Sequence, residues 1–215
     1  MKKRNYLFAL AVLWGLSMAC EEQNEEPIPA LTNEAFTTQD FSFRDWGLAR
    51  VEYLDPNDLL STEPTHVNYA LSIVNTGLRE RIFGGRRFFE LDTDIAVGEV
   101  NLLVVNLFAP VSTLGLSAEE NLLGGAGERT FELRSLNNNP PGDTDFFYLE
   151  ASMIRESYVQ SHVDRSFVFK EGTITISGTA PDFTVSFDAV MLDAVRNIEA
   201  TFTGSTTGTF KIKEN

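Results

Sequence analysis

The chain has 215 residues, and its 31 aspartate and glutamate residues outnumber its 17 lysine and arginine residues, which gives a formal charge of −14 at neutral pH. This acidity argues against nucleic acid as a partner and against lying flat on an anionic membrane, because both require a basic surface. The length suits a single domain with a core large enough to fold alone. With only one cysteine in the chain, an intramolecular disulfide is excluded, so stability must come from the core.

The first twenty residues have the pattern of an export signal. Basic residues at positions 2–4 precede an apolar run from Tyr6 to Leu16, and small residues then lead to Cys20. The apolar run is too short for a transmembrane helix, which needs about 20 apolar residues. An ordinary cleaved signal would leave Cys20 as a free thiol in an oxidising compartment, which is unusual.

The stretch from Leu16 to Cys20 resembles the signal of bacterial lipoproteins, which ends in a small residue and an obligatory cysteine. It departs from the usual pattern because Leu16 stands four residues before the cysteine and Ser17 holds the usual leucine position, a looser form familiar among Bacteroidetes lipoproteins. The resemblance implies that residues 1–19 are removed and that Cys20 carries the lipid that anchors the chain in a membrane. The mature chain would have a formal charge near −17, because three basic residues leave with the signal.

Residues 20–32 are acidic, contain proline and lack apolar periodicity, so we expect a disordered tether between the lipidated cysteine and the domain. Acidic residues just after the cysteine resemble the surface-export signal of Bacteroidetes lipoproteins. That resemblance implies an outer-membrane protein displayed on the cell surface, with a periplasm-facing site as the alternative.

Residues 33–215 are predicted to form one all-β domain, because apolar and polar residues alternate along many short segments. A bulge or bend is expected at Gly47 and a turn at Glu171-Gly172. The expected strands cover 41–44, 49–53, 67–73, 89–94, 101–108, 130–136, 146–154, 167–169, 174–176, 183–189, 198–202 and 210–212.

Two segments depart from this alternation. Residues 101–108 are apolar on both faces, which predicts a central strand covered from both sides. Ser117 followed by Glu120 forms a capping box, and Gly124-Gly125 ends the segment, so one short helix is expected over 117–123.

These elements predict a single antiparallel β-sandwich or jelly roll of about ten strands with one short helix; the alternative is a lipocalin-like barrel. The repeated threonine, glycine and phenylalanine of 172–178, 183–188 and 202–210 resemble the ending of many uncharacterised Bacteroidetes lipoproteins. This second resemblance implies an all-β lipoprotein domain and no particular activity.

We find no catalytic constellation in the sequence. A hydrolytic triad would have to use His66 or His162, the two histidines, and no Gly-x-Ser-x-Gly sequence is present. Two scattered histidines do not predict a zinc site. Glycoside hydrolysis needs only two carboxylates, for which Asp92 with Asp94, side by side on a strand, or a second pair, Asp143 with Asp145, are candidates.

Three groups of residues are candidates for ligand binding. Trp46 is either a stacking platform for a sugar or part of the core. The loop with Asn137, Asn139, Asp143 and Asp145 offers oxygen atoms for Ca²⁺ or for sugar hydroxyls, or is simply a solvated hairpin loop. The third group is basic and either pairs with acids of the same sheet or holds a carboxylate or sulfate: Arg79, Arg81, Arg86 and Arg87.

The sequence thus predicts a membrane-anchored cell-envelope lipoprotein with a non-enzymatic binding role, whose partner is a glycan or a protein at the outer-membrane surface. No organic cofactor and no nucleic acid partner are expected. The alternatives are a small jelly-roll hydrolase that acts on glycans and a structural subunit of an envelope assembly.

Overall fold

The computed structural model describes residues 34–54, 64–96, 98–133, 148–157, 162–193 and 196–214. All of them lie within one compact unit, Leu31–Asn215. Its helical elements are η1 (Thr38–Phe41), η2 (Val111–Thr113), α2 (Ala118–Leu123) and η3 (Gly124–Ala126). Its strands are β1 (Glu34–Thr37), β2 (Asp45–Leu54), β3 (Pro64–Val74), β4 (Leu78–Phe83), β5 (Arg86–Leu91), β6 (Glu99–Pro110), β7 (Glu128–Glu132), β8 (Tyr148–Ser157), β9 (His162–Thr179), β10 (Asp182–Asp193), β11 (Ile198–Thr209) and β12 (Lys211–Glu214).

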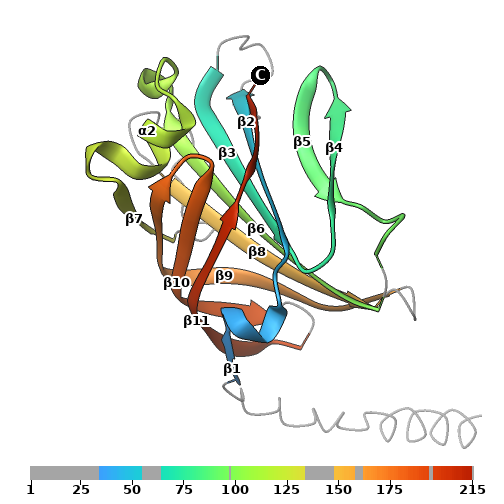
Figure 1. Cartoon of the computed structure of the whole chain (residues 1–215). Helices are drawn as coiled ribbons and strands as arrows, with labels where there is room; N and C mark the ends of the chain where they lie inside the picture. Colours follow the sequence, from blue (N-terminus) through green and yellow to red (C-terminus); the bar gives the residue numbers. More distant parts are fainter. Residues whose placement is uncertain are drawn as a thin grey trace, which may run out of the picture. The chain divides into compact units, whose positions relative to one another are not determined.

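The main sheet has ten strands in the order β1-β11-β10-β9-β8-β6-β3-β2-β12, with β7 paired to β9 (Figure 1). Its neighbours are antiparallel except for two parallel pairs, β1 with β11 and β2 with β12. Among the described strands, β1 and β12 end this order and do not pair with each other, so the sheet is not closed into a barrel. The predicted all-β sandwich is confirmed, and the barrel alternative is wrong.

The inner face of the sheet encloses one large core. On β6, the side chains of Leu103, Val105 and Leu107 are fully buried, because every second residue of a strand points to the same side. Phenylalanine rings fill much of the remaining space, and Phe202 packs edge-on against Phe187 at 5.1 Å. Strands from both halves of the sheet and the helix α2 contribute to this single core.

The predicted strand at 41–44 is wrong, because residues 38–41 form the 3₁₀ turn η1 instead. The Asp40 carboxylate accepts a hydrogen bond from the backbone N–H of Thr37 at 2.6 Å, which caps this turn. Phe41 is still buried in the core. The alternation of phenylalanine with polar residues therefore indicated burial correctly but not the backbone conformation.

Two glycines have roles other than those predicted. Gly47 lies inside β2 without a bulge, and a Cβ atom there would come within 2.5 Å of the Phe89 ring. Gly172 lies inside β9, which continues without a turn, and it has φ +118 with the Asp188 carbonyl oxygen 2.3 Å from a built Cβ. Both glycines allow a neighbouring chain segment to approach closely.

The strand β6 occupies the central position that its composition predicts, between β3 and β8. Its second face is covered only in part, since Leu102 packs against a smaller core whereas Val104 and Asn106 remain half-buried. The expectation of full cover on both faces is therefore wrong over much of the strand.

That smaller core lies under a separate two-stranded sheet, the β4–β5 hairpin, which Figure 1 shows beside β2. Phe89 of the hairpin sits over Gly47, and Leu78 and Phe89 pack with Ala49 and Val100. The hairpin is thus attached to the outer face of the main sheet by its base.

The predicted helix is confirmed as α2, Ala118–Leu123. The Ser117 hydroxyl accepts a hydrogen bond from the N–H of Glu120, and the Glu120 carboxylate accepts one from the N–H of Ser117. Leu122 and Leu123 are buried in the main core, so the capping box and two leucines hold the helix in place.

Candidate functional site

A pocket of about 320 Å³ lies between the β4–β5 hairpin and the outer face of the main sheet. Its polar wall consists of Arg79, Arg81 and Glu90 from the hairpin, together with Thr93. Its apolar lining is aliphatic and contains Leu91, Val100, Leu102 and Ile154. This volume is at the lower end of the range for ligand pockets, which is about 300–1,000 Å³.

Glu90 orients the polar wall by bonding two arginines at once. Its carboxylate accepts hydrogen bonds from Arg79 Nε and Arg81 Nη1, both at 2.8 Å. The hydrogen bonds from Arg81 and Arg79, together with their positive charge, hold the pKa of Glu90 below its ordinary value of 4.5. The prediction that the basic cluster pairs with acids of its own sheet is confirmed for these two arginines.

The other acidic residue of the hairpin is shared in the same way. Glu80 lies 3.4 Å from Arg87 Nη1 and 3.0 Å from Lys213 Nζ of β12. Arg86 has no acidic partner among the residues that the structure describes. The hairpin therefore carries four arginines against two glutamates, a local excess of positive charge in a chain whose formal charge is −14.

The tip of the hairpin exposes two large apolar side chains. Ile82 is 61% exposed and Phe83 is 73% exposed, the highest values among the large hydrophobic residues that the structure describes. Across the strand pair, Ile82 faces Arg87 and Phe83 faces Arg86. Gly84 and Gly85 form the two-residue turn, and their positive φ values of 58° and 78° are those that such a hairpin requires.

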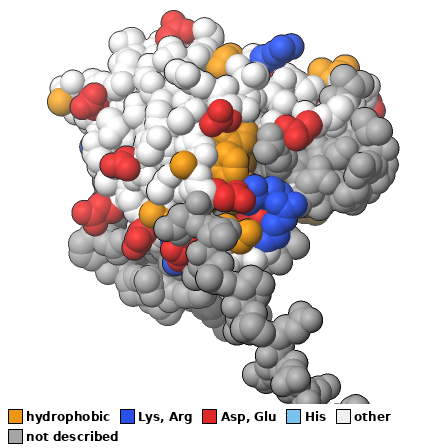
Figure 2. Space-filling view, turned by 90° about the horizontal axis from the view of Figure 1, so that it is seen from below, with side chains coloured by type: hydrophobic (Ala, Val, Ile, Leu, Met, Phe, Trp, Pro, Cys, Tyr) orange, Lys and Arg blue, Asp and Glu red, His pale blue; other side chains and the backbone are white. Residues whose placement is uncertain are grey.

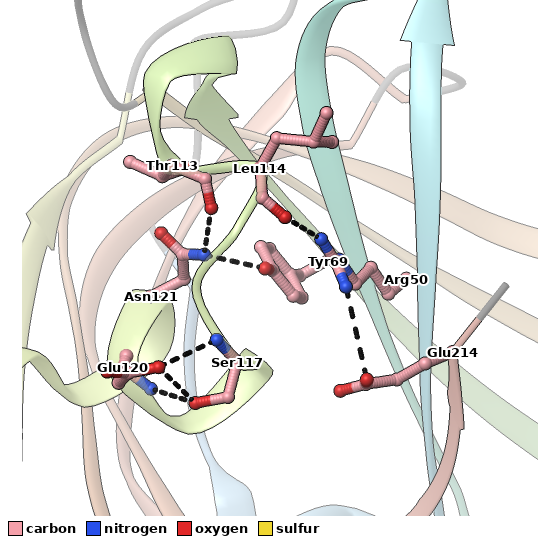
Figure 3. A network of polar contacts seen from close by, with 8 residues as sticks. All are labelled: Arg50, Tyr69, Thr113, Leu114, Ser117, Glu120, Asn121 and Glu214. Carbon is pink, nitrogen blue, oxygen red and sulfur yellow. Dashed lines mark hydrogen bonds and ion pairs between the residues drawn. The ribbon is translucent and has the colours of Figure 1, made fainter.

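A second polar cluster lies at another edge of the domain, where α2 meets β3 (Figure 3). The Asn121 side-chain amide donates to the Tyr69 hydroxyl at 2.7 Å and to the Thr113 carbonyl at 3.2 Å. Arg50 donates to the Leu114 carbonyl and lies 3.9 Å from Glu214. These contacts tie β2, β3, the η2–α2 segment and the C-terminal strand together.

Burial raises the pKa of Tyr69, against the opposing influence of the nearby Arg50 charge and the hydrogen bond from Asn121. The phenol is therefore protonated at neutral pH and is not poised to act as a general base. Tyr69 and Asn121 are both fully buried. We interpret this cluster as a structural clamp on α2 rather than as a binding site.

Trp46 is half-buried and packs against the main core. Gly208 lies so close to its ring that an added Cβ would stand 2.1 Å from a ring carbon. The indole Nε1 is buried, with no hydrogen-bond partner among the described residues. This placement favours the interpretation of Trp46 as a core residue, and sugar stacking by Trp46 stays a prediction.

The Asp92 and Asp94 pair does not lie on a strand, because β5 ends at Leu91. The Asp92 carboxylate accepts a hydrogen bond from the N–H of Asp94 within a turn, and Asp94 lies 3.4 Å from Arg79. The expected side-by-side arrangement on a strand face is therefore wrong.

Several predicted site residues lie outside the described residues, and their roles stay predictions. They are Cys20, Asn137, Asn139, Asp143 and Asp145. The backbone of His66 lies in β3 and that of His162 in β9.

Within the described ranges, no group of three or more histidine, cysteine, aspartate or glutamate side chains is arranged to hold a metal ion. No helix among the described residues is long and apolar enough to cross a membrane. Comparison of the chain with models of protein families, with curated proteins and with solved structures found no match.

Sequence reasoning found the arginines of this site but not its apolar half. Leu102 and Ile154 are register partners on neighbouring strands, β6 and β8, and Ile154 lies far along the chain from the hairpin. The exposed pair at the tip had a signal that was available, since Ile82 and Phe83 directly precede the Gly84-Gly85 turn. Apolar residues next to a tight turn are the ones that solvent reaches most easily.

Proposed function

We propose that this chain is a lipid-anchored, non-enzymatic binding protein of the outer membrane, and that the β4–β5 hairpin with its pocket binds a protein or glycan partner. The lipid anchor is supported by the sequence around Cys20, whose basic, apolar and small residues resemble a lipoprotein signal. Display at the cell surface is supported by the acidic residues that follow.

The binding role rests on one observation, the β4–β5 hairpin, whose exposed apolar tip adjoins an arginine-lined pocket. Arginine and aromatic side chains are enriched at the centres of protein interfaces. An exposed Ile82–Phe83 pair contributes little to the core of its own domain, and neighbouring exposed apolar side chains support a contact with a partner.

The binding role is tested in cells by introducing a photo-crosslinking amino acid in place of Phe83 and, as a control, in place of Leu116. Leu116 is also exposed, at 41%, but lies before α2, away from the hairpin. We expect discrete crosslinked products from position 83 and none from position 116. Equal labelling from both positions would contradict a binding role for the hairpin.

The anchor is tested separately. We expect Cys20→Ala to move the protein from the membrane fraction to the soluble fraction, since the lipid would have no attachment site. Retention of the variant in the membrane fraction would refute lipidation at Cys20 without bearing on the hairpin.

A further inference from the structure

One face of the β4–β5 hairpin, together with the pocket, forms a continuous surface of arginine and apolar groups. Residues paired across an antiparallel ladder point to the same side, and successive pairs alternate between the two faces. Arg81 and Phe88 therefore share a face with the pairs two positions away, Arg79 with Glu90 and Phe83 with Arg86. This face runs from Arg79 and Glu90 at the pocket to Phe83 and Arg86 at the tip. We call it the arginine face.

The arginine face has N–H groups that remain available to bind anions. Each guanidinium has five N–H donors, and the contact of Arg81 with Glu90 uses Nη1 alone. Arg86 has no acidic partner among the described residues. The two glutamates of the hairpin are each shared between two cations, and Asp94 pairs with Arg79, so the donors left for added carboxylates are those of Arg86 and the remaining N–H groups of Arg81.

The rest of the molecule limits what kind of anion fits. The chain as a whole is acidic, and Figure 2 shows acidic side chains scattered over one side of the described surface. Attraction between exposed charges is screened beyond about 8 Å at physiological salt. The strand β4 has six residues, or about 20 Å, so a short anionic segment can contact the hairpin alone. A long anionic polymer or an anionic membrane would also meet the acidic remainder and be repelled.

The pocket adds an apolar requirement. Its floor is aliphatic, formed by Val100, Leu102 and Ile154, and no aromatic ring lines it among the residues that the structure describes. Such a floor suits an aliphatic side chain better than a sugar ring, which is commonly bound by stacking on an aromatic surface.

We propose that the arginine face binds a short acidic segment of a partner protein, with carboxylates on Arg81 and Arg86 and an aliphatic side chain in the pocket. This inference rests on the binding role proposed above and assigns its partner class. It predicts that affinity falls as salt concentration rises.

The test measures binding of fluorescently labelled synthetic peptides to the purified full chain in an uncharged detergent. One peptide alternates Asp and Glu with Leu, and a second replaces its acids with lysine. Polygalacturonate and phosphatidylglycerol vesicles are competing probes for the glycan and membrane classes. We expect the acidic peptide to bind and the lysine peptide not to bind.

Two variants locate the binding. Arg81→Glu combined with Arg86→Glu should weaken binding of the acidic peptide about tenfold or more, whereas the matched reversal Lys170→Glu on β9 should not. Ile154→Glu, which places a carboxylate on the pocket floor, should weaken binding similarly, whereas Leu116→Glu should not. Unchanged circular dichroism would show that each variant is folded.

Each alternative outcome is decisive. Binding of the acidic peptide that survives both the Arg81/Arg86 variant and the Ile154 variant would overturn the inference, and so would an absence of peptide binding. Polygalacturonate or vesicle binding that is lost in the Arg81/Arg86 variant would refute the acidic-peptide partner but retain the hairpin as a binding element. The photo-crosslinking experiment judges the binding role independently, so failure of one proposal is distinguishable from failure of the other.

Discussion

At the residue scale, one buried arginine, Arg165 of β9, links three strands. Its Nε donates to the fully buried carboxylate of Asp193 at 2.8 Å, and its Nη2 donates to Glu34 at 2.7 Å. The guanidinium also lies over the Phe167 ring, 4.5 Å from its centroid. Arg165 thereby joins β9 to the end of β10 and to the edge strand β1.

Removal of Arg165 should be far more costly than removal of an exposed ion pair. Arg165→Met removes the Arg165 cation from the buried Asp193 carboxylate, so we expect the free energy of unfolding to fall by about 3–5 kcal/mol. Lys170→Met, which breaks the exposed pair with Glu199, should lower the free energy of unfolding far less, because solvent screens exposed ion pairs. Urea unfolding of both variants measures the difference, and equal losses would refute the role assigned to Arg165.

Gly208 is a position where the lack of a side chain is required for packing. Because a Cβ at this position would stand 2.1 Å from the Trp46 ring, Gly208→Ala should force the ring to move. We expect about 1–3 kcal/mol of destabilisation, the usual cost of overpacking. Gly115→Ala is the matched control, since nothing lies within 4 Å of its added Cβ. Thermal melting compares the two, and similar midpoints would show that Trp46 is not packed as described.

At the scale of elements, the β4–β5 hairpin combines a fixed turn, a packed base and an exposed tip. Its register follows from Gly84-Gly85, and its base is held by Phe89 over Gly47. Ion pairs that involve both of its glutamates add to these contacts. The hairpin should therefore respond to pH more than the main sheet does.

The sign of this response follows from Glu90, whose pKa is lowered in the folded chain. A carboxylate whose pKa is lowered by folding stabilises the fold at pH values above its ordinary pKa of 4.5. This contribution is lost as the pH falls through the lower pKa of the folded state. As the pH is lowered below 4.5, we expect the β4 and β5 amides to lose protection from hydrogen exchange at a higher pH than the β10 amides do, after correction for intrinsic exchange rates. Simultaneous loss of protection in both would contradict local control by Glu90.

At the scale of the whole molecule, two connections run between opposite ends of the strand order of the main sheet. The segment from β1 to β2 makes one crossing, and the segment from β11 to β12 makes the other. Phe210 stands at the second crossing, is almost fully buried, and packs edge-on against Phe183 at 5.6 Å. Phe210 thus contributes to stability, whereas the binding role proposed for the hairpin assigns partner contact to the exposed Phe83.

This separation can be measured with two equivalent truncations. Phe210→Ala should lower the free energy of unfolding by about 3–5 kcal/mol, because it opens a cavity in the core. Phe83→Ala at the hairpin tip should change it by no more than about 0.5 kcal/mol, since the ring is already exposed. Urea denaturation tests both, and a large loss for Phe83→Ala would mean that the tip is part of the stabilising structure.

Local patterns in the sequence were sufficient for the fold class, for the helix α2 and for the central place of β6. They depend on neighbouring residues: the Ser117–Glu120 box closes within one turn, and alternation identifies the core face of a strand such as β10. The pairing of the hairpin arginines with acids of their own sheet was also predictable, because Arg79 and Glu90 are close in sequence and the turn between them is clear.

Long-range packing decided the rest. Glycine at positions 47 and 172 signals backbone freedom, but only the neighbouring strand shows that the freedom serves close approach rather than a bend. The pocket depends on Leu102 and Ile154, which sheet pairing brings together although 51 residues lie between them along the chain. Composition and alternation determined that the chain is an acidic all-β domain, whereas strand order decided where its charged and apolar surfaces meet, because contacts between distant segments leave no periodic trace in the sequence.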